Sequence, residues 1–128
     1  MSLKTKIGCD LVCISRFKKS LQLEKFVNRI FHKQEIAYCE QKHDKASSYA
    51  ARFAAKEAFS KALGSGMFAD GLAPNDIWVQ NLENGKPQIF VSNKLQTKLN
   101  SLGVCDYDVS LSHHEDYAMA VVTITQEI

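Results

Sequence analysis

The segment from about residue 45 to residue 63 constrains the fold more than any other part of the chain. It is rich in alanine, contains neither Gly nor Pro, and is followed by Gly64. Alanine has the highest helix propensity, and a glycine just past the last helical position commonly ends a helix in a left-handed conformation. The sequence therefore predicts one long central helix against which the other elements must pack.

Shorter elements are predicted before this helix. Residues 7–12 alternate as in a strand, with Ile7, Cys9 and Leu11 on one face and Gly8, Asp10 and Val12 on the other. Apolar residues recur at helical spacing in residues 15–23 and 24–31, and a third helix is expected at 33–41. Residues 42–45 lack apolar periodicity and are expected to form a loop.

Two hairpins are predicted after the long helix. Strands at 77–80 and 88–91 flank Asn84-Gly85-Lys86-Pro87, and strands at 107–112 and 117–125 flank a loop at 113–116. A helix at 92–102 separates them, with Ser92 as its N-cap and Gly103 at its end. Because hairpins pair antiparallel, the expected class is α+β: a compact antiparallel sheet packed with a long central helix and shorter helices.

The length of 128 residues and the hydrophobic content of 45% fit a single domain, residues 1–128, with a small core. A site that needs deep walls in so small a domain can draw them from a second copy, so oligomerisation is plausible. No apolar run approaches the roughly 20 residues that span a bilayer, and no signal-peptide core is evident, so we expect a cytoplasmic protein without membrane association. Cys9, Cys13, Cys39 and Cys105 form no CxxC pair and are expected to be buried free thiols rather than zinc ligands.

Positive charge is concentrated near the N-terminus. The net charge is only +2, which argues against a general nucleic-acid-binding protein, yet residues 14–33 contain six basic residues and one acidic residue. This segment is either a solvated helix face or a docking surface for an acidic partner, and charge alone does not distinguish the two.

The long helix contains a group of charged residues. Arg52, Lys56 and Lys61 surround the carboxylate of Glu57, which could provide donors for phosphate oxygens beside one oxygen ligand for a metal. Mg²⁺ commonly uses one or two carboxylates together with substrate phosphates, and Asp10 is the natural second ligand. The alternative is an ordinary i,i+4 ion pair between Glu57 and Lys61, worth about 0.3–0.5 kcal/mol.

Gly64-Ser65-Gly66 has the composition of a phosphate-binding turn. It follows a helix instead of preceding one, so it matches neither the P-loop nor the dinucleotide-binding fingerprint. Those two nucleotide-binding folds are disfavoured.

Three segments together resemble the bacterial acyl-carrier-protein synthases, which are 4′-phosphopantetheinyl transferases. In chain order they are residues 7–12, residues 52–66 (RFAAKEAFSKALGSG) and Asn84-Gly85-Lys86-Pro87. The resemblance extends over nearly the whole chain, and the second segment is the most specific. It implies a compact α+β fold and a homotrimer with active sites between protomers.

The resemblance also implies roles for individual residues. Asp10 and Glu57 match the Mg²⁺-binding acids, and Lys61 matches a lysine near the coenzyme A phosphates. The residues that match coenzyme A contacts are Arg52, Ser60, Gly64, Pro87 and His113. His113 lies in a Ser-x-Ser-His stretch where many relatives have Ser-x-Thr-His. The contact of the 3′-phosphate stays unassigned among Lys42, His43, Asp44 and Lys45.

The implied reaction is attack of a carrier-protein serine on the β-phosphorus of coenzyme A, with release of adenosine 3′,5′-bisphosphate. Such transfers depend on positioning and on stabilisation of phosphoryl charge. Either Glu57 or a metal-bound water could take the serine proton, and the sequence does not choose between them. The basic segment at 14–33 would then dock the acidic acyl carrier protein, through Arg16 first and Lys19 with it.

Two other functions are compatible with the same residues. One is a non-catalytic nucleotide- or phosphate-binding module in which Glu57 and Lys61 form only a helix pair. The other is a transferase with a broader range that acts on peptidyl carrier proteins, although such enzymes typically resemble two fused copies of this unit. A single copy of 128 residues favours the acyl carrier protein.

Overall fold

The computed structural model describes residues 2–64, 68 and 71–128. Its elements follow the chain in this order: β1 (Leu3–Cys13), α1 (Ile14–Leu21), α2 (Glu24–Ile30), α3 (Lys33–Glu40), α4 (Lys45–Leu63), a short 3₁₀ helix (Pro74–Asp76), β2 (Ile77–Asn81), β3 (Pro87–Val91), α5 (Asn93–Ser101), β4 (Val104–His114) and β5 (Tyr117–Glu127). The predicted long helix is confirmed, and it ends at Gly64 with a φ of 76°.

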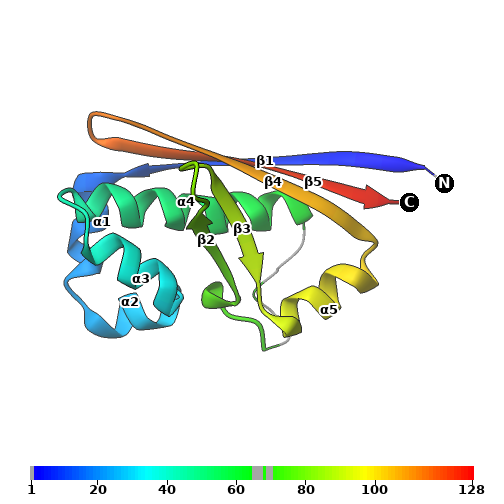
Figure 1. Cartoon of the computed structure of the whole chain (residues 1–128), viewed down its shortest axis with the longest axis horizontal. Coiled ribbons are helices and arrows are strands. Elements are labelled where there is room, and N and C mark those ends of the chain that lie inside the picture. Colours follow the sequence, from blue (N-terminus) through cyan, green and yellow to red (C-terminus); the bar gives the residue numbers. More distant parts are fainter. Residues whose placement is uncertain (1, 65–67, 69–70) are drawn as a thin grey trace.

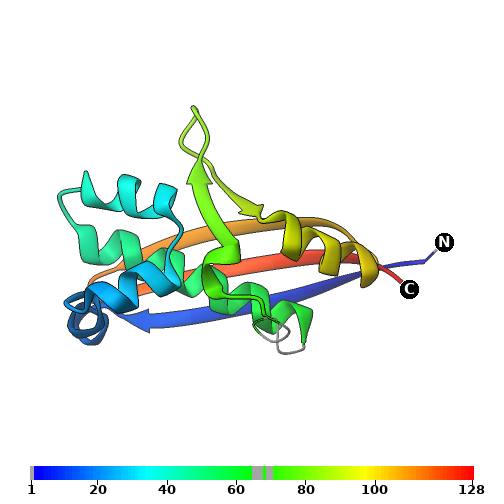
Figure 2. The same ribbon diagram turned by 90° about the horizontal axis from the view of Figure 1, so that it is seen from below.

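The described strands form two antiparallel units. The larger is a three-stranded sheet in the order β1-β5-β4, and β2 and β3 form a separate hairpin. Figure 1 shows α4 along one face of the larger sheet, with the other helices and the β2–β3 hairpin on that same side. Seen from below, α4 runs along the sheet with α1–α3 at one end and α5 at the other (Figure 2). The α+β prediction is confirmed.

Two strands are longer than predicted. Strand β1 pairs with β5 from Leu3, opposite Glu127, to Cys13, opposite Tyr117. Strand β4 continues to His114, so the second hairpin turns through two residues instead of the expected four. In both cases backbone pairing with β5 carries polar residues into a strand, which apolar alternation does not reveal. Among the described residues, no helix has both the length and the apolar character needed to cross a membrane.

Strand β1 lies unusually close to α4 at Gly8. A Cβ atom on Gly8 would lie 2.0 Å from the carbonyl oxygen of Ala58 and 2.7 Å from the amide nitrogen of Ala62. Both helix residues are buried alanines, so small side chains on the helix and no side chain on the strand permit the contact. Asp10 lies two residues further along the same face of β1 and is therefore brought to the last turns of α4.

Lys56 lies in the core and not beside Glu57 in a phosphate site. Its side chain is 1% exposed, and its Nζ lies 2.7 Å from Oε1 of Glu35, which is 0% exposed. Nζ also donates hydrogen bonds to the carbonyl oxygens of Pro74, at 3.1 Å, and Ile77. The prediction that Lys56 supplies a phosphate donor is wrong, because the ladder of Arg52 and Lys56 faces α3 and β2.

The predicted burial of the cysteines is right for one residue and wrong for two. Cys39 is buried, which raises the pKa of its thiol to about 12, and Cys13 is half-buried. Cys9 and Cys105 are exposed. Cys9 alternates onto the face of the sheet that α4 does not cover, and sequence alternation alone does not say which face that is.

The buried ion pair provides a test of its structural role. Replacing Lys56 by Met should lower the free energy of unfolding by about 3–5 kcal/mol, because Glu35 would remain buried without its partner. Urea denaturation followed by circular dichroism measures the loss. Lys45→Met is the matched control, since Lys45 forms a 3.1 Å pair with Glu40 in which both side chains are half exposed, and should cost less than about 1 kcal/mol. Equal losses in the two variants would contradict the assignment.

Candidate active site

Three of the predicted catalytic residues meet where β1 crosses the last turns of α4. Lys61 Nζ donates to Oδ1 of Asp10 at 3.0 Å and to the carbonyl oxygen of Cys9 at 3.1 Å. Glu57 lies one turn before Lys61 on the same helix and is half-buried. The side chain of Lys61 is 58% exposed and that of Asp10 is 18% exposed, so the ion pair lies at an open surface and not in the core.

The electrostatics of this cluster favour a cation. Burial and then the charge of Asp10 raise the pKa of Glu57, and Lys61 lowers it. The hydrogen bond and charge of Asp10 raise the pKa of Lys61. Two carboxylates that repel one another are a suitable pair of oxygen ligands for Mg²⁺. No group of three or more metal-ligating side chains occurs among the described residues, so water and substrate oxygens would have to complete the coordination.

Arg52 lies in a separate groove of about 420 Å³. It is 3% exposed and donates from Nη2 to Oδ1 of Asn81 at 2.6 Å and from Nη1 to the carbonyl oxygen of Ser48 at 3.3 Å. The guanidinium carbon lies 4.2 Å from the centroid of the Tyr38 ring. His113 lines the same groove, so the structure brings two of the predicted coenzyme A contacts together.

The charge of Arg52 has no carboxylate partner in the described part of the chain, and its buried Nε has no hydrogen-bond partner there. A buried cation without an ion pair is costly, which suits a groove that receives an anionic ligand. Lys42 and His43 also line this groove, so part of the unassigned loop lies beside Arg52. Tyr38 and Asn81 were missed by sequence reasoning. The only available signal was that Asn81 immediately follows the first predicted strand of that hairpin, residues 77–80.

The other predicted coenzyme A contacts lie elsewhere. Ser60 is half-buried in α4, and its carbonyl oxygen accepts a hydrogen bond from the Gly64 amide at 3.2 Å. Ser65 and Gly66, the rest of the glycine-containing turn, lie outside the described residues.

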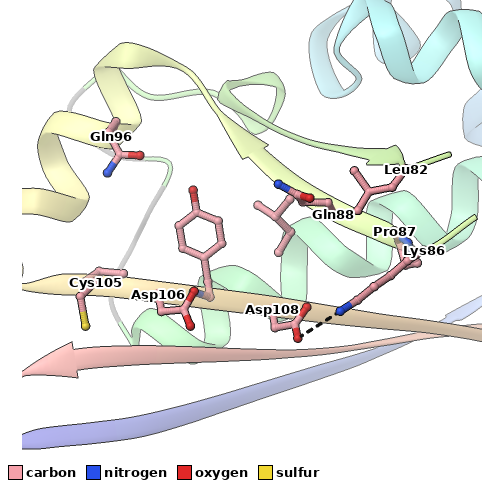
Figure 3. A pocket seen from close by; sticks show the side chains of 11 residues that line it. Leu82, Lys86, Pro87, Gln88, Gln96, Cys105, Asp106 and Asp108 are labelled. Carbon is pink, nitrogen blue, oxygen red and sulfur yellow. Dashed lines mark hydrogen bonds and ion pairs between the residues drawn. The ribbon is translucent and has the colours of Figure 1, made fainter. Parts of the chain in front are cut away.

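Pro87 starts β3 and lines a third cavity, of about 440 Å³, together with Lys86 and Asp108 (Figure 3). Lys86 Nζ lies 3.8 Å from Oδ2 of Asp108, across the gap between the β2–β3 hairpin and β4. Neither Asp10 nor Arg52 lines this cavity. Within a single chain, the predicted coenzyme A contacts therefore lie on separate surfaces.

The predicted docking residues lie on α1, and one of them reaches the Asp10 surface. Arg16 and Asp10 line a common groove of about 570 Å³. Apolar rings form much of its wall, with Phe17 and Phe53 at 5.0 Å between centroids. Lys19 is exposed on the same helix but does not line the groove.

Known proteins with this sequence pattern are holo-[acyl-carrier-protein] synthases. The relative from Geobacter sp. (strain M21) is 40% identical over 119 residues, which cover 91% of this chain and 94% of the relative. The crystal structure of the synthase from Neisseria meningitidis is 30% identical, has a TM-score of 0.85, and is matched over 93% of this chain and 96% of its own. The Helicobacter pylori synthase, solved in complex with coenzyme A, is 35% identical with a TM-score of 0.79 over 92% of this chain and 98% of its own.

The model of one protein family covers most of the chain. It matches residues 6–122, which include the Asp10 cluster, the Arg52 groove and the β2–β3 hairpin. The chain belongs to the 4′-phosphopantetheinyl transferase superfamily.

Proposed function

We propose that this protein transfers the 4′-phosphopantetheine group of coenzyme A to a serine of apo acyl carrier protein, for fatty acid biosynthesis. The products are holo acyl carrier protein and adenosine 3′,5′-bisphosphate. The observation that carries the proposal is the meeting of Asp10, Glu57 and Lys61, where Asp10 also lines the groove that contains the basic residue Arg16. The family and the names of its relatives support the same reaction.

Each part of the site has a separate task in this proposal. Asp10 and Glu57 would hold Mg²⁺, which supplies positive charge to phosphoryl oxygens. Lys61 neutralises charge on the diphosphate, and its exposure allows the ammonium group to move from Asp10 to a substrate oxygen. Arg52 and His113 bind the nucleotide part of coenzyme A in their common groove.

In a homotrimer with sites between protomers, coenzyme A contacts that lie on separate surfaces of one chain would come together from different chains. Ser60, Gly64 and Pro87 would then line one pocket, with Pro87 contributed from a different protomer than Asp10. An uncovered apolar sheet face supports this assembly. Ile7, Leu11, Tyr117 and Met119 are 69%, 62%, 49% and 40% exposed and lie on the β1–β5 face opposite α4.

We also propose that the protein works in the cytoplasm. The exposed free thiols of Cys9 and Cys105 suit a reducing compartment.

The metal assignment predicts a loss of turnover without a loss of fold. Asp10→Asn and Glu57→Gln should each lower kcat by about 100-fold or more, because each removes charge stabilisation from the transferring phosphoryl group. The assay is mass spectrometry of apo carrier protein after incubation with coenzyme A and Mg²⁺, where a phosphopantetheine-sized gain on one serine is expected. Glu83→Gln, in the β2–β3 loop, is the control. Normal Mg²⁺-dependent rates in either variant would refute the assignment, and coenzyme A binding without transfer by the unmodified protein would favour a non-catalytic binding module.

Substitutions on the docking surface and substitutions at the catalytic cluster should change different kinetic constants. Reversing Arg16 and Lys19 to Glu should raise the KM for carrier protein and weaken its salt dependence, because charges at the rim of an interface act mainly on association. Lys61→Ala should instead lower kcat, and the loss should persist at saturating carrier protein. Steady-state kinetics at low and high salt, with a separate coenzyme A titration, distinguish the two defects. Lys4→Glu, on a distant part of β1, is the control. If the variant with Arg16 and Lys19 reversed to Glu has an unchanged KM for carrier protein, α1 is only a solvated helix face and the docking proposal is wrong.

Assembly can be tested at the uncovered sheet face. The protein should sediment as a trimer at assay concentration, and Ile7→Lys should convert it to inactive monomer, because a charge would be buried between protomers. Leu23→Lys is the matched control, since Leu23 is 63% exposed but lies between α1 and α2 and not on the sheet. A fully active monomer would overturn the shared-site proposal.

A further inference from the structure

The tip of the β4–β5 hairpin holds the first turn of α1. Oδ1 of Asp116 accepts a hydrogen bond from the Ser15 amide at 3.0 Å, and Oδ2 accepts from the Ser15 hydroxyl at 2.7 Å. Cys13 Sγ donates to the same Oδ2 at 3.3 Å, and the backbone carbonyl of Asp116 accepts from the Ile14 amide at 2.7 Å. A residue in the second hairpin therefore binds a helix that begins about one hundred residues earlier.

This helix has no cap of its own. Its N-cap residue, Cys13, makes no side-chain capping hydrogen bond, and no acidic residue occurs in its first turn. The first amides of a helix need acceptors, and a negative charge near them is favourable. Asp116 supplies both from outside the helix. The hydrogen bonds from Ser15 and Cys13 lower the pKa of Asp116, so its carboxylate is ionised at neutral pH.

Apolar packing of α1 is centred on Phe17, whose ring lies 5.0 Å from that of Phe53, and Leu21 is partly buried against the core. The buried residues of α1 are Ile14 and Phe17, and no residue after Phe17 is buried to the same extent. The turn that presents Asp116 includes Glu115 at a φ of 53°, a left-handed conformation that a residue with a side chain adopts at some cost. The direction in which α1 leaves β1 therefore depends on this apolar packing together with the polar contacts at its start, most of which Asp116 makes.

We propose that Asp116 is a positioning residue for carrier-protein docking: by capping α1 it places Arg16 at the edge of the groove that contains Asp10. This inference rests on the proposed function of α1. Tyr117, the next residue, lines that groove, whereas His113, three residues earlier, lines the Arg52 groove. One hairpin tip thus contacts the surfaces proposed for both substrates.

The sign of the charge effect makes the proposal testable. Because the carrier protein is acidic, neutralising an acid near the docking surface should by itself strengthen attraction and lower the carrier-protein KM. Loss of a helix cap acts in the opposite direction. A rise in KM when Asp116 is neutralised can therefore not come from the change in net charge.

The experiment compares Asp116→Ala, which removes both acceptor oxygens, with Glu115→Gln, which changes the net charge equally in the same turn. Glu115 has no described contact with α1 and lies 3.6 Å from His114. Asp116→Ala should raise the KM for carrier protein about threefold to tenfold, the range expected for a lost cap, with kcat and coenzyme A affinity unchanged. Glu115→Gln should leave KM unchanged or lower it. Ser15→Ala, which removes only the hydroxyl bond, should give a smaller rise.

Hydrogen exchange gives a readout that does not require activity. In Asp116→Ala the amides of Ser15 and Ile14 should exchange faster while those of α4 are unchanged, with the unmodified protein as reference. Unchanged exchange at these amides would overturn the positioning role. Faster exchange with an unchanged or lowered carrier-protein KM would overturn its connection to docking. Absence of transfer by the unmodified protein would instead refute the proposed function, and the exchange result would still decide whether Asp116 fixes α1. If Asp116→Ala fails to fold, the comparison is made with Ser15→Ala.

Discussion

The close approach of β1 to α4 at Gly8 is the contact on which the candidate active site depends. There is no room for a Cβ atom between this strand and the helix backbone at Ala58 and Ala62. The approach brings Asp10 within 3.0 Å of Lys61, although the two residues are far apart in the chain. A larger residue at position 8 would push the strand away and separate Asp10 of β1 from Glu57 and Lys61 of α4.

A buried ion pair holds the opposite side of α4. Glu35 accepts hydrogen bonds from the Val79 amide at 3.0 Å and from the His32 amide at 3.1 Å, in addition to its 2.7 Å contact with Lys56. It thereby links α3, α4 and β2 in a region where water is excluded. Because Lys56 is occupied there, Lys61 and Arg52 are the basic residues of α4 that remain in the proposed site.

The residues proposed to bind the two substrates line separate grooves. Arg52 and His113 line the groove proposed for the nucleotide, and Arg16 and Asp10 line the groove proposed for carrier-protein docking. Pro87 lines a third cavity. The reaction needs a phosphoryl group placed between these surfaces, so their relative orientation matters as much as their composition. Within one protomer, the β4–β5 hairpin and the long helix α4 connect the groove of Arg52 and His113 with the groove of Arg16 and Asp10.

The sequence by itself determined the long helix and the α+β class, and it predicted Asp10, Glu57 and Lys61 as catalytic residues. Alanine content, the absence of Gly and Pro, and the terminal Gly64 are local properties, and so is the spacing of Glu57 and Lys61. Only the tertiary structure decided that Lys56 pairs with Glu35 and that Asp116 caps α1. Periodicity reports which residues share a face, but not which distant element covers that face. Partners as far apart as residues 15 and 116 are therefore decided by packing.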